Sequence, residues 1–281
     1  MQANSRRLPE YAVVILLSVL VSYGLFTVAN PKQGSTTTTS VLDRVLSSGT
    51  LRAAAPVSGG LPIAGRDASG AITGWMPDMW AELAKSLKVK LEIVDTPGES
   101  RIPFIQAGQV DVAQGTITLE RAQAVGFTLL PSDAGAQAGA TLSSSGISSY
   151  DQVGAKKVGV TTGSNAELFI PTLFPQAQLS HFADTATNLQ ALKSGQVDIV
   201  FDDAVTLAKA HADDPSVVLL PAVKTEPGGL MAPLGDQKWI NYLTYFVWDF
   251  YATGTSTCGC GRQIWEKWYG APPADKFLPQ Y

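Results

Sequence analysis

The sequence predicts an α/β protein with two similar lobes, and an internal repeat is the strongest indication. Residues 105–112 and 192–199 share one order: an apolar helix end, a glycine, a short polar turn and an apolar strand. Helical and strand patterns alternate around them, which favours parallel strands joined by crossover helices. Ligands of such sheets bind just beyond the carboxyl ends of the strands, so the polar residues after each repeat are candidate site residues.

Helical spacing and a capping residue place the elements of the first half. Pro77 fits a first helical position, where its missing N–H costs no hydrogen bond. Trp80, Leu83 and Leu87 follow at helical spacing. Thr118 fits the N-cap of a later helix. The expected order is helix 41–48, strand 51–55, turn 66–70, a helix from 77, strand 89–94, helix 100–107, strand 110–114 and helix 118–125.

The second half shows the same alternation. A Ser-rich turn at 142–149 precedes strand 157–160, and a polar loop at 161–165 follows that strand. Helices 166–173 and 187–194, strand 197–201, helix 204–212 and strand 217–220 are expected next. The remainder is helical, and we interpret its aromatic residues as core and domain packing: Trp239, Tyr242, Tyr245, Phe246, Trp248, Phe250, Tyr251, Trp265 and Trp268.

The first residues indicate export. Arg6 and Arg7 precede an apolar run over about residues 12–29, and no charge lies between Glu10 and Lys32. This order is typical of a signal peptide, although the run is nearly long enough to span a bilayer. We therefore expect residues 1–30 to be a signal peptide or an N-terminal anchor, residues 31–40 to be a polar linker, and the folded body to be periplasmic.

The composition is that of a packed globular protein without a nucleic-acid surface. The 281 residues are 45% hydrophobic and 16% charged, with a formal net charge of −4. Disordered chains are less hydrophobic, and nucleic-acid binding normally needs a basic face. We expect a monomer that binds no nucleic acid.

The two cysteines, Cys258 and Cys260, flank Gly259. An exported chain favours a disulfide, but a bridge over one intervening residue closes a small ring. A metal site needs further ligands, and no histidine is near in sequence. A glycine-rich surface turn without chemistry is the third interpretation.

Arg121 is the most distinctive candidate for ligand binding. Its guanidinium is always charged and matches the geometry of a carboxylate. It lies near the start of the expected helix 118–125, where an anion also meets free N–H groups. Thr116 adds a hydroxyl from the same loop. The alternative is that Arg121 only pairs with Glu120 or another surface acid.

Two later segments offer further groups. Gly163 and Ser164 join a strand to a helix, so their N–H groups face any anion at the helix start, unless Ser164 is only a cap. Asp202 and Asp203 follow strand 197–201. One of them can cap the next helix, and the other can accept hydrogen bonds from an ammonium group.

Recognisable catalytic motifs are missing. The sequence has no G-x-S-x-G elbow, no H-E-x-x-H and no P-loop. His181 and His211 lack triad spacing and are expected at the surface. We therefore expect no catalytic residue, no metal ligand and no cofactor.

Several motifs occur in a fixed order: Gly74-Trp75-Met76-Pro77-Asp78, Arg101-Ile102-Pro103, Gly108-Gln109-Val110-Asp111, Thr116-Ile117-Thr118-Leu119-Glu120-Arg121 and Val125-Gly126-Phe127-Thr128. Over residues 41–270 the chain resembles the type II periplasmic solute-binding proteins of family 3, the polar-amino-acid receptors of ABC importers. Their corresponding segments are G-F-D-x-D-L, R-I-P-x-L-x-x-G-x-V-D, T-I-T-x-E-R and V-D-F-S.

The resemblance implies a periplasmic binding protein-like II fold, with two α/β lobes, a two-strand hinge and the ligand cleft between the lobes. Lobe 1 would be 41–138 plus 226–281, and lobe 2 would be 139–225. Arg121 would hold the carboxylate of the ligand and Asp203 its ammonium group. The implied ligand-binding residues are Gln114, Gly115, Thr116, Arg121, Gly163, Ser164 and Asp203.

The chain departs from the family at the positions that would surround the side chain of the ligand. Positions near Val57, Gly60 and Gly98, where members often carry aromatic residues, are not aromatic here. Leu129-Leu130-Pro131-Ser132 replaces the P-Y after V-D-F-S. We expect a less aromatic pocket than is usual.

The expected function is that of an exported substrate-binding protein, which captures an amino acid or similar zwitterion and delivers it to a membrane ABC permease. The alternatives are a cyclohexadienyl or arogenate dehydratase and an anchored ligand-sensing domain. A dehydratase needs a general acid in the cleft, and Glu99 is the nearest candidate.

Overall fold

The computed structural model describes residues 39–252, 258–270 and 273, and the described residues from Ser40 onward belong to one compact unit. The predicted signal peptide or anchor at 1–30 and the linker, apart from Thr39 and Ser40, lie outside the described residues. None of the helices in the described part is both long and apolar enough to cross a membrane.

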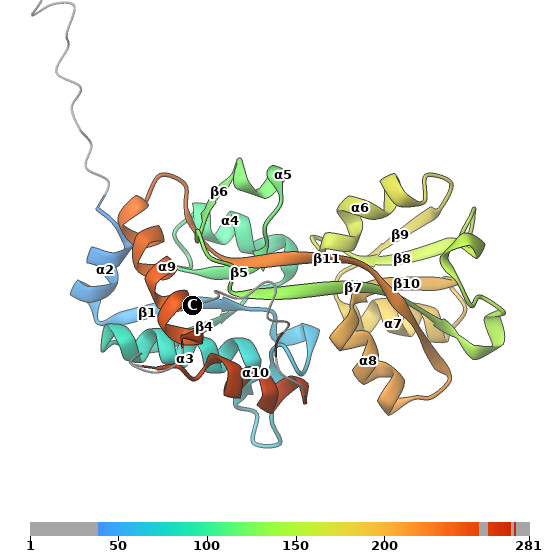
Figure 1. Ribbon diagram of the computed structural model, residues 1–281, viewed down its shortest axis with the longest axis horizontal. Helices are drawn as coiled ribbons and strands as arrows, with labels where there is room; N and C mark the ends of the chain where they lie inside the picture. Colours follow the sequence, from blue (N-terminus) through green and yellow to red (C-terminus); the bar gives the residue numbers. More distant parts are fainter. Residues whose placement is uncertain (1–38, 253–257, 271–272, 274–281) are drawn as a thin grey trace, which may run out of the picture. The chain divides into compact units, whose positions relative to one another are not determined.

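The first elements build one core around a parallel strand pair (Figure 1). Helix α2 (Val41–Ser48) begins at Ser40, whose side chain accepts a hydrogen bond from the Leu42 N–H. Strand β1 (Thr50–Ala55) pairs in parallel with β4 (Lys90–Asp95). The short strands β2 (Gly65–Arg66) and β3 (Ile72–Thr73) flank the predicted turn, and α3 (Trp75–Leu87) follows.

Helix α3 begins two residues before its predicted start. Gly74 precedes it with φ 139, and a Cβ there would lie 2.5 Å from the carbonyl oxygen of Ile63. Pro77 is therefore the third helical residue and not the first. Its missing N–H still costs nothing, because the first N–H groups of a helix have no acceptor within it.

Two predicted boundaries near the candidate site are wrong. The strand predicted at 110–114 is β5 (Ala113–Thr116), and it follows α4 (Arg101–Gln106). The helix predicted at 118–125 is the single turn α5 (Leu119–Ala122), because Val125 already begins the strand β6 (Val125–Phe127), which pairs with β11.

A seven-stranded mixed sheet organises the rest of the described chain, with the order β5-β11-β7-β10-β8-β9 and β6 beside β11. The pair β8–β10 is parallel, as expected, and β8 is also parallel to β9, whereas β7 and β11 are antiparallel to their neighbours. Strands β7 and β9 were not predicted. The elements are β7 (Asp133–Leu142), β8 (Lys157–Thr161), α6 (Asn165–Leu173), β9 (Gln178–Phe182), α7 (Thr185–Lys193), β10 (Ile199–Asp203), α8 (Ala204–Asp213), β11 (Val217–Pro233), α9 (Gln237–Tyr251) and α10 (Gly261–Tyr269).

Strands β7 and β11 connect two groups of helices (Figure 1). They pair from Leu142 and Val217 at one end to Asp133 and Gly228 at the other. Buried side chains of α2, α3 and α9 form one core, whereas α6 packs on one face of β10 and α7 with α8 on the other. This is the two-lobed architecture. The lobe boundaries at 138/139 and 225/226 remain our proposal.

The internal repeat is also structural. Gly108 and Gly195 have φ of 66 and 73, and their N–H groups bond to the carbonyls of Ile105 (3.1 Å) and Leu192 (3.0 Å). Asp111 then accepts a hydrogen bond from the N–H of Arg52 at 2.9 Å, and Asp198 accepts one from the N–H of Lys157 at 2.8 Å. In both units an aspartate therefore bonds to the backbone of the neighbouring parallel strand.

The two aspartates differ in burial, which makes them a matched pair for a stability test. The Asp111 side chain is fully buried and also pairs with Arg52 at 2.6 Å and with Arg44. We expect Asp111→Ala to lower the free energy of unfolding by about 2–3 kcal/mol and Asp198→Ala by about 1 kcal/mol. Urea denaturation measures both, and equal losses would contradict this ranking.

Candidate functional site

A cavity of about 160 Å³ lies between the two lobes. It is smaller than the roughly 300–1,000 Å³ pockets that hold drug-sized ligands, so its size suits a small metabolite. Of the seven residues predicted to bind ligand, Gly163 does not line this cavity. The other six do: Gln114, Gly115, Thr116, Arg121, Ser164 and Asp203.

The Arg121 side chain starts on the short helix α5 of lobe 1 and reaches across to lobe 2. Thr118 caps this helix by accepting a hydrogen bond from the Arg121 N–H at 3.3 Å. The guanidinium donates to the carbonyl of Thr116 at 3.1 Å and to the carbonyl of Gly163 at 2.9 Å. Burial lowers the pKa of Arg121, while the carboxylates of Glu226 and Asp203 oppose that shift. No carboxylate of the described residues forms a direct ion pair with this guanidinium, so a ligand carboxylate can pair with it.

Asp203 lies at the end of β10 and has a carboxylate that is not used for capping. It occupies the N-cap position of α8 without a side-chain capping bond. One of its oxygens accepts a hydrogen bond from the Gln137 side chain. Burial, followed by the charge of Asp202, raises the pKa of Asp203 to about 7.

The neighbouring Asp202 is the structural member of the pair. Its carboxylate accepts hydrogen bonds from Thr161 (3.1 Å), Thr185 (2.8 Å) and the N–H of Asp203 (2.8 Å). Burial raises the pKa of this carboxyl group, and the Thr185 hydroxyl opposes the shift. Asp202 therefore supports the loop, and Asp203 is the better candidate for contact with a ligand.

Gly163 is the point where the lobes meet. Its φ is +74, and a Cβ there would lie 2.4 Å from the Glu99 nitrogen. Its N–H donates to Glu167 at 2.8 Å and its carbonyl accepts from Arg121. The absence of a side chain therefore lets the lobes approach each other at this position.

Replacing Gly163 should hinder closure. We expect Gly163→Ala to weaken ligand binding about tenfold, since strain of about 1–3 kcal/mol arises mainly in the closed form. Gly146→Ala is the matched control, because Gly146 has φ +72 and nothing within 4 Å of an added Cβ. Calorimetric titration compares the two variants, and unchanged affinity in Gly163→Ala would refute a role in closure.

Arg101 and Asp133 are charged cavity residues that were not predicted as site residues. Arg101 entered only through the R-I-P resemblance, yet it lines the cavity and donates to the Gln114 carbonyl at 2.8 Å. Burial, followed by the charge of Arg121, lowers its pKa to about 10. Asp133 accepts a hydrogen bond from the Gln114 side chain at 2.7 Å, and burial raises its pKa. The signal for Arg101 was its place at the start of a helix, directly after the turn at Gly98–Ser100; Asp133 gave none.

Aromatic side chains line part of the cavity, and the expectation of a pocket less aromatic than is usual for the family stays a prediction. Trp75, Trp265 and Tyr269 line the cavity, although none lies at the positions where the family was expected to carry aromatic residues. Trp75 and Trp265 meet edge to face with ring centroids 5.4 Å apart. The interpretation of Trp265 as core packing alone missed this second role, because helical spacing does not show which helix faces the cleft.

Two donors in the cavity wall lack a partner. Among the described residues, the Trp75 Nε1 and the Asn165 Nδ2 are buried and form no hydrogen bond, and both residues line the cavity. Buried polar groups are normally satisfied. These donors therefore suit a ligand that brings hydrogen-bond acceptors.

Glu99, the candidate general acid of a dehydratase, does not line this cavity. It lines an adjoining hollow, which shares Gly98, Arg101, Arg121 and Ser164 with the cavity. The position of Glu99 gives no support to acid catalysis in the cleft.

Comparison with known proteins identifies the family. Residues 57–270 match the model of the bacterial extracellular solute-binding proteins, family 3, and the chain belongs to this family. The resemblance inferred from the motifs is thus confirmed.

Two curated relatives are named for amino acids. The chain is 28% identical over 214 residues to the ABC transporter glutamine-binding protein GlnH of Bacillus subtilis, with coverage of 74% of this chain and 76% of that protein. It is 26% identical over 208 residues to the L-cystine-binding protein TcyJ of Escherichia coli, with coverage of 72% and 76%.

Solved structures agree with the fold. The ancestral amino acid-binding protein AncCDT-1, described as a precursor of cyclohexadienyl dehydratase, superposes with a TM-score of 0.73 at 28% identity, covering 82% of this chain and 100% of that one. An ancestral arginine-binding protein bound to arginine gives a TM-score of 0.72 at 28% identity, with coverage of 79% and 99%.

Proposed function

We propose that this chain captures an amino acid or a similar small zwitterion and delivers it to the membrane permease of an ABC importer. The observation that carries the proposal is one cavity lined by Arg121 from lobe 1 and Asp203 from lobe 2. A guanidinium suits a carboxylate and an aspartate suits an ammonium group. Both reach the same small ligand only when the lobes are closed, so the ligand favours closure.

The remaining predicted residues receive supporting roles in this proposal. Thr116 and Ser164 add hydroxyls near the ligand carboxylate, and the carbonyl of Gln114 or Gly115 assists at the ammonium group. Gly163 acts through Arg121, because its carbonyl accepts a hydrogen bond from that guanidinium. The unpaired donors of Trp75 and Asn165 favour a ligand side chain with an oxygen acceptor.

The relatives support binding rather than catalysis. Curated relatives are named as glutamine-, cystine- and histidine-binding proteins, and Glu99 lies outside the cavity. We propose that the chain is not an enzyme, that it acts in the periplasm, and that residues 1–30 either are removed or hold it at the inner membrane.

A thermal-shift screen tests the proposal. Amino acids, including the acidic ones and their amides, are added separately to the purified chain, and so are prephenate and arogenate. We expect one or a few amino acids to raise the melting temperature, since a ligand at about 100 times its Kd stabilises by about 2.7 kcal/mol. Turnover of prephenate or arogenate without stabilisation by any amino acid would favour the dehydratase and refute the proposal.

A further inference from the structure

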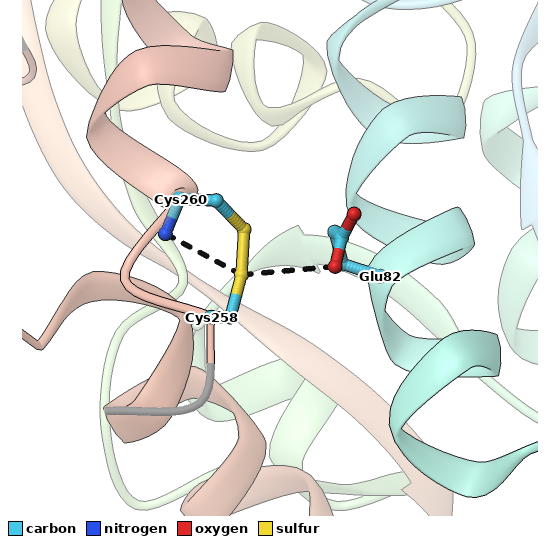
Figure 2. A group of neighbouring side chains, drawn as sticks. All are labelled: Glu82, Cys258 and Cys260. Carbon is cyan, nitrogen blue, oxygen red and sulfur yellow. Dashed lines mark hydrogen bonds between the residues drawn. A yellow bond between two sulfur atoms is a disulfide. The ribbon is translucent and has the colours of Figure 1, made fainter. Parts of the chain in front are cut away.

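The two cysteines lie beside an acid from a distant part of the chain. The structure records Cys258 and Cys260 as a disulfide, with their Cα atoms 5.1 Å apart. The Glu82 carboxylate of α3 faces this pair, with 3.8 Å between the Glu82 Oε2 and the Cys258 Sγ (Figure 2). One potential ligand atom of each residue lies within 4.8 Å of the other two. Sequence inspection missed this third ligand because it precedes Cys258 by 176 residues.

We propose that reduction of this disulfide creates a binding site for a thiophilic divalent metal ion, with Zn²⁺ as the ion that the ligands suit best. Cys258, Cys260 and Glu82 supply three ligands, and water fills the fourth position. Zn²⁺ accepts this mixture of thiolate and carboxylate in tetrahedral geometry.

The conversion needs a two-electron reductant, such as a dithiol. Two electrons and two protons pass from the dithiol to the Cys258–Cys260 bond, which breaks into two thiols while the dithiol becomes a disulfide. The metal ion then binds both sulfurs as thiolates and releases two protons. Glu82 joins as a carboxylate, so the metal, two thiolates and one carboxylate carry a total charge of −1.

The separations fit a shared metal. Bond lengths of about 2.3 Å to sulfur and 2.1 Å to oxygen at a tetrahedral angle place sulfur and oxygen about 3.6 Å apart. The Cys258 Sγ and the Glu82 Oε2 already lie 3.8 Å apart. Reduction frees the two sulfurs to separate by side-chain rotation, without movement of α3.

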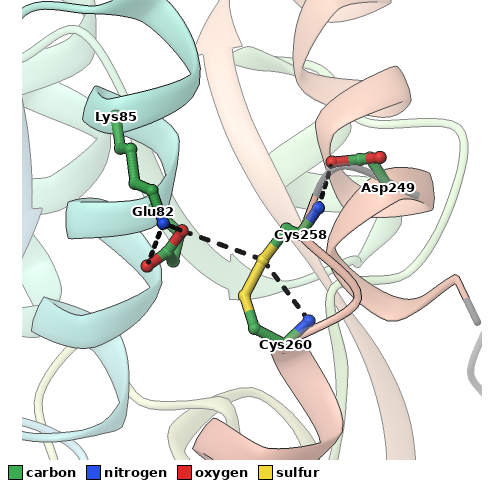
Figure 3. Close-up of a disulfide and its surroundings, with 5 residues drawn as sticks. All are labelled: Glu82, Lys85, Asp249, Cys258 and Cys260. Atoms are coloured by element: carbon green, nitrogen blue, oxygen red, sulfur yellow. Dashed lines mark hydrogen bonds and ion pairs between the residues drawn. A yellow bond between two sulfur atoms is a disulfide. The ribbon is translucent and has the colours of Figure 1, made fainter. Parts of the chain in front are cut away.

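The local backbone favours thiolates. Cys260 is the N-cap of the nine-residue helix α10, so its sulfur lies at the positive end of the helix dipole. The Cys260 N–H lies 3.4 Å from the Cys258 Sγ, and the Cys258 N–H donates to Asp249 of α9 at 3.2 Å (Figure 3). The segment is thus anchored while its sulfurs remain half-buried and accessible.

Lys85 is a competing cation at Glu82. Lys85 pairs with the Glu82 Oε2 at 3.0 Å (Figure 3). The Lys85 side chain is 74% exposed, so it returns to water at little cost when a divalent ion takes that oxygen.

The site would connect ion binding to the ligand cavity. It joins α10, which carries Trp265 and Tyr269, to α3, which carries Trp75. These three rings line the cavity. A metal ion held by Glu82 and both cysteines would therefore tie α10 to α3 beside this aromatic wall, whereas the disulfide closes only the turn between Cys258 and Cys260.

Cobalt binding tests the proposal independently of any amino acid. The full chain is reduced with a phosphine, freed of reagent under anaerobic conditions and titrated with Co²⁺, whose thiolate charge-transfer absorption reports coordination by sulfur. We expect one Co²⁺ per reduced chain with this absorption, displacement by Zn²⁺, and no such absorption for the oxidised chain. Cys258→Ser and Cys260→Ser should each lose it, and Glu82→Gln should weaken binding at least tenfold.

Glu92→Gln is the matched control, since Glu92 is an exposed acid on β4, and it should bind Co²⁺ like the wild type. Circular dichroism confirms that each variant is folded. A reduced wild type without stoichiometric sulfur coordination would overturn the proposal, as would equal Co²⁺ affinity of wild type and Glu82→Gln.

Discussion

Arg121→Ala is expected to lose at least 30-fold in ligand affinity, a loss of about 2 kcal/mol, because truncation of one partner of a buried charge pair costs about 2–5 kcal/mol. The guanidinium lines the cavity and also donates to the Gly163 carbonyl of the other lobe. Its removal therefore takes away both the partner of the ligand carboxylate and a contact between the lobes. Calorimetric titration with the amino acid found by the screen measures the effect.

Two controls separate charge from geometry. Arg121→Lys keeps the positive charge without the planar fork, so its affinity should fall between those of wild type and Arg121→Ala. Arg66→Ala removes an exposed arginine of β2 and should bind normally. Wild-type affinity in Arg121→Ala would show that the carboxylate is held elsewhere.

Asp203→Asn should also weaken binding by at least 30-fold, about 2 kcal/mol, and should remove most of the pH dependence of binding near neutrality. The pKa of Asp203 is raised to about 7 in the ligand-free chain, first by burial and then by Asp202. An ammonium group binds the ionised carboxylate. Wild-type affinity should therefore rise as the pH increases through about 7 and fall below it.

The stability of the ligand-free chain should change with pH in the opposite direction from the ligand affinity. Because the folded state raises the pKa of Asp203 from 3.8 to about 7, it binds more protons than the unfolded state between these values. Its stability therefore falls as the pH rises across this interval. Asp202 and Asp133 have pKa values raised mainly by burial and contribute in the same direction.

Calorimetry at several pH values measures the ligand affinity, and urea denaturation at the same pH values measures the stability. Asp213→Asn replaces an exposed aspartate of α8 and should leave both unchanged. If Asp203→Asn kept wild-type affinity or the full pH dependence of binding, Asp203 would not be the partner of the ammonium group.

Local patterns were sufficient for the elements that bury regular apolar faces. The helix at α2 was predicted with its correct ends, and in the structure Ser40 caps its start and Gly49 its end. The repeated turns at Gly108 and Gly195 were visible because the same glycine, polar residue and apolar strand recur. Such signals depend only on neighbours in sequence.

The connecting strands could be predicted only in part: the strand predicted at 217–220 is the start of β11, and β7 gave no signal. Strand β7 is rich in alanine and glycine and contains the buried Gln137, so it has no alternation of apolar and polar residues. Strand β11 includes Pro221, Lys224 and Pro227 and has register shifts in its pairing with β7. Pairing with distant strands fixes both elements, and sequence periodicity does not report it.

The sequence revealed only part of the candidate site. Arg121 and Asp203 follow recognisable strand ends. Ligands bind beyond such ends, so the sequence located both residues. Arg101 and Asp133 reach the cavity through tertiary packing, and Trp265 reaches it because α10 packs against α3. The distance between Glu82 and the cysteines likewise appears only in the folded chain.

The crystal structure of the chain with its amino acid bound is the most direct test. The account predicts that the ligand carboxylate lies within hydrogen-bond distance of the Arg121 guanidinium and that the ammonium group contacts the Asp203 carboxylate. A ligand held in the cavity with both of these side chains turned away from it would contradict the account.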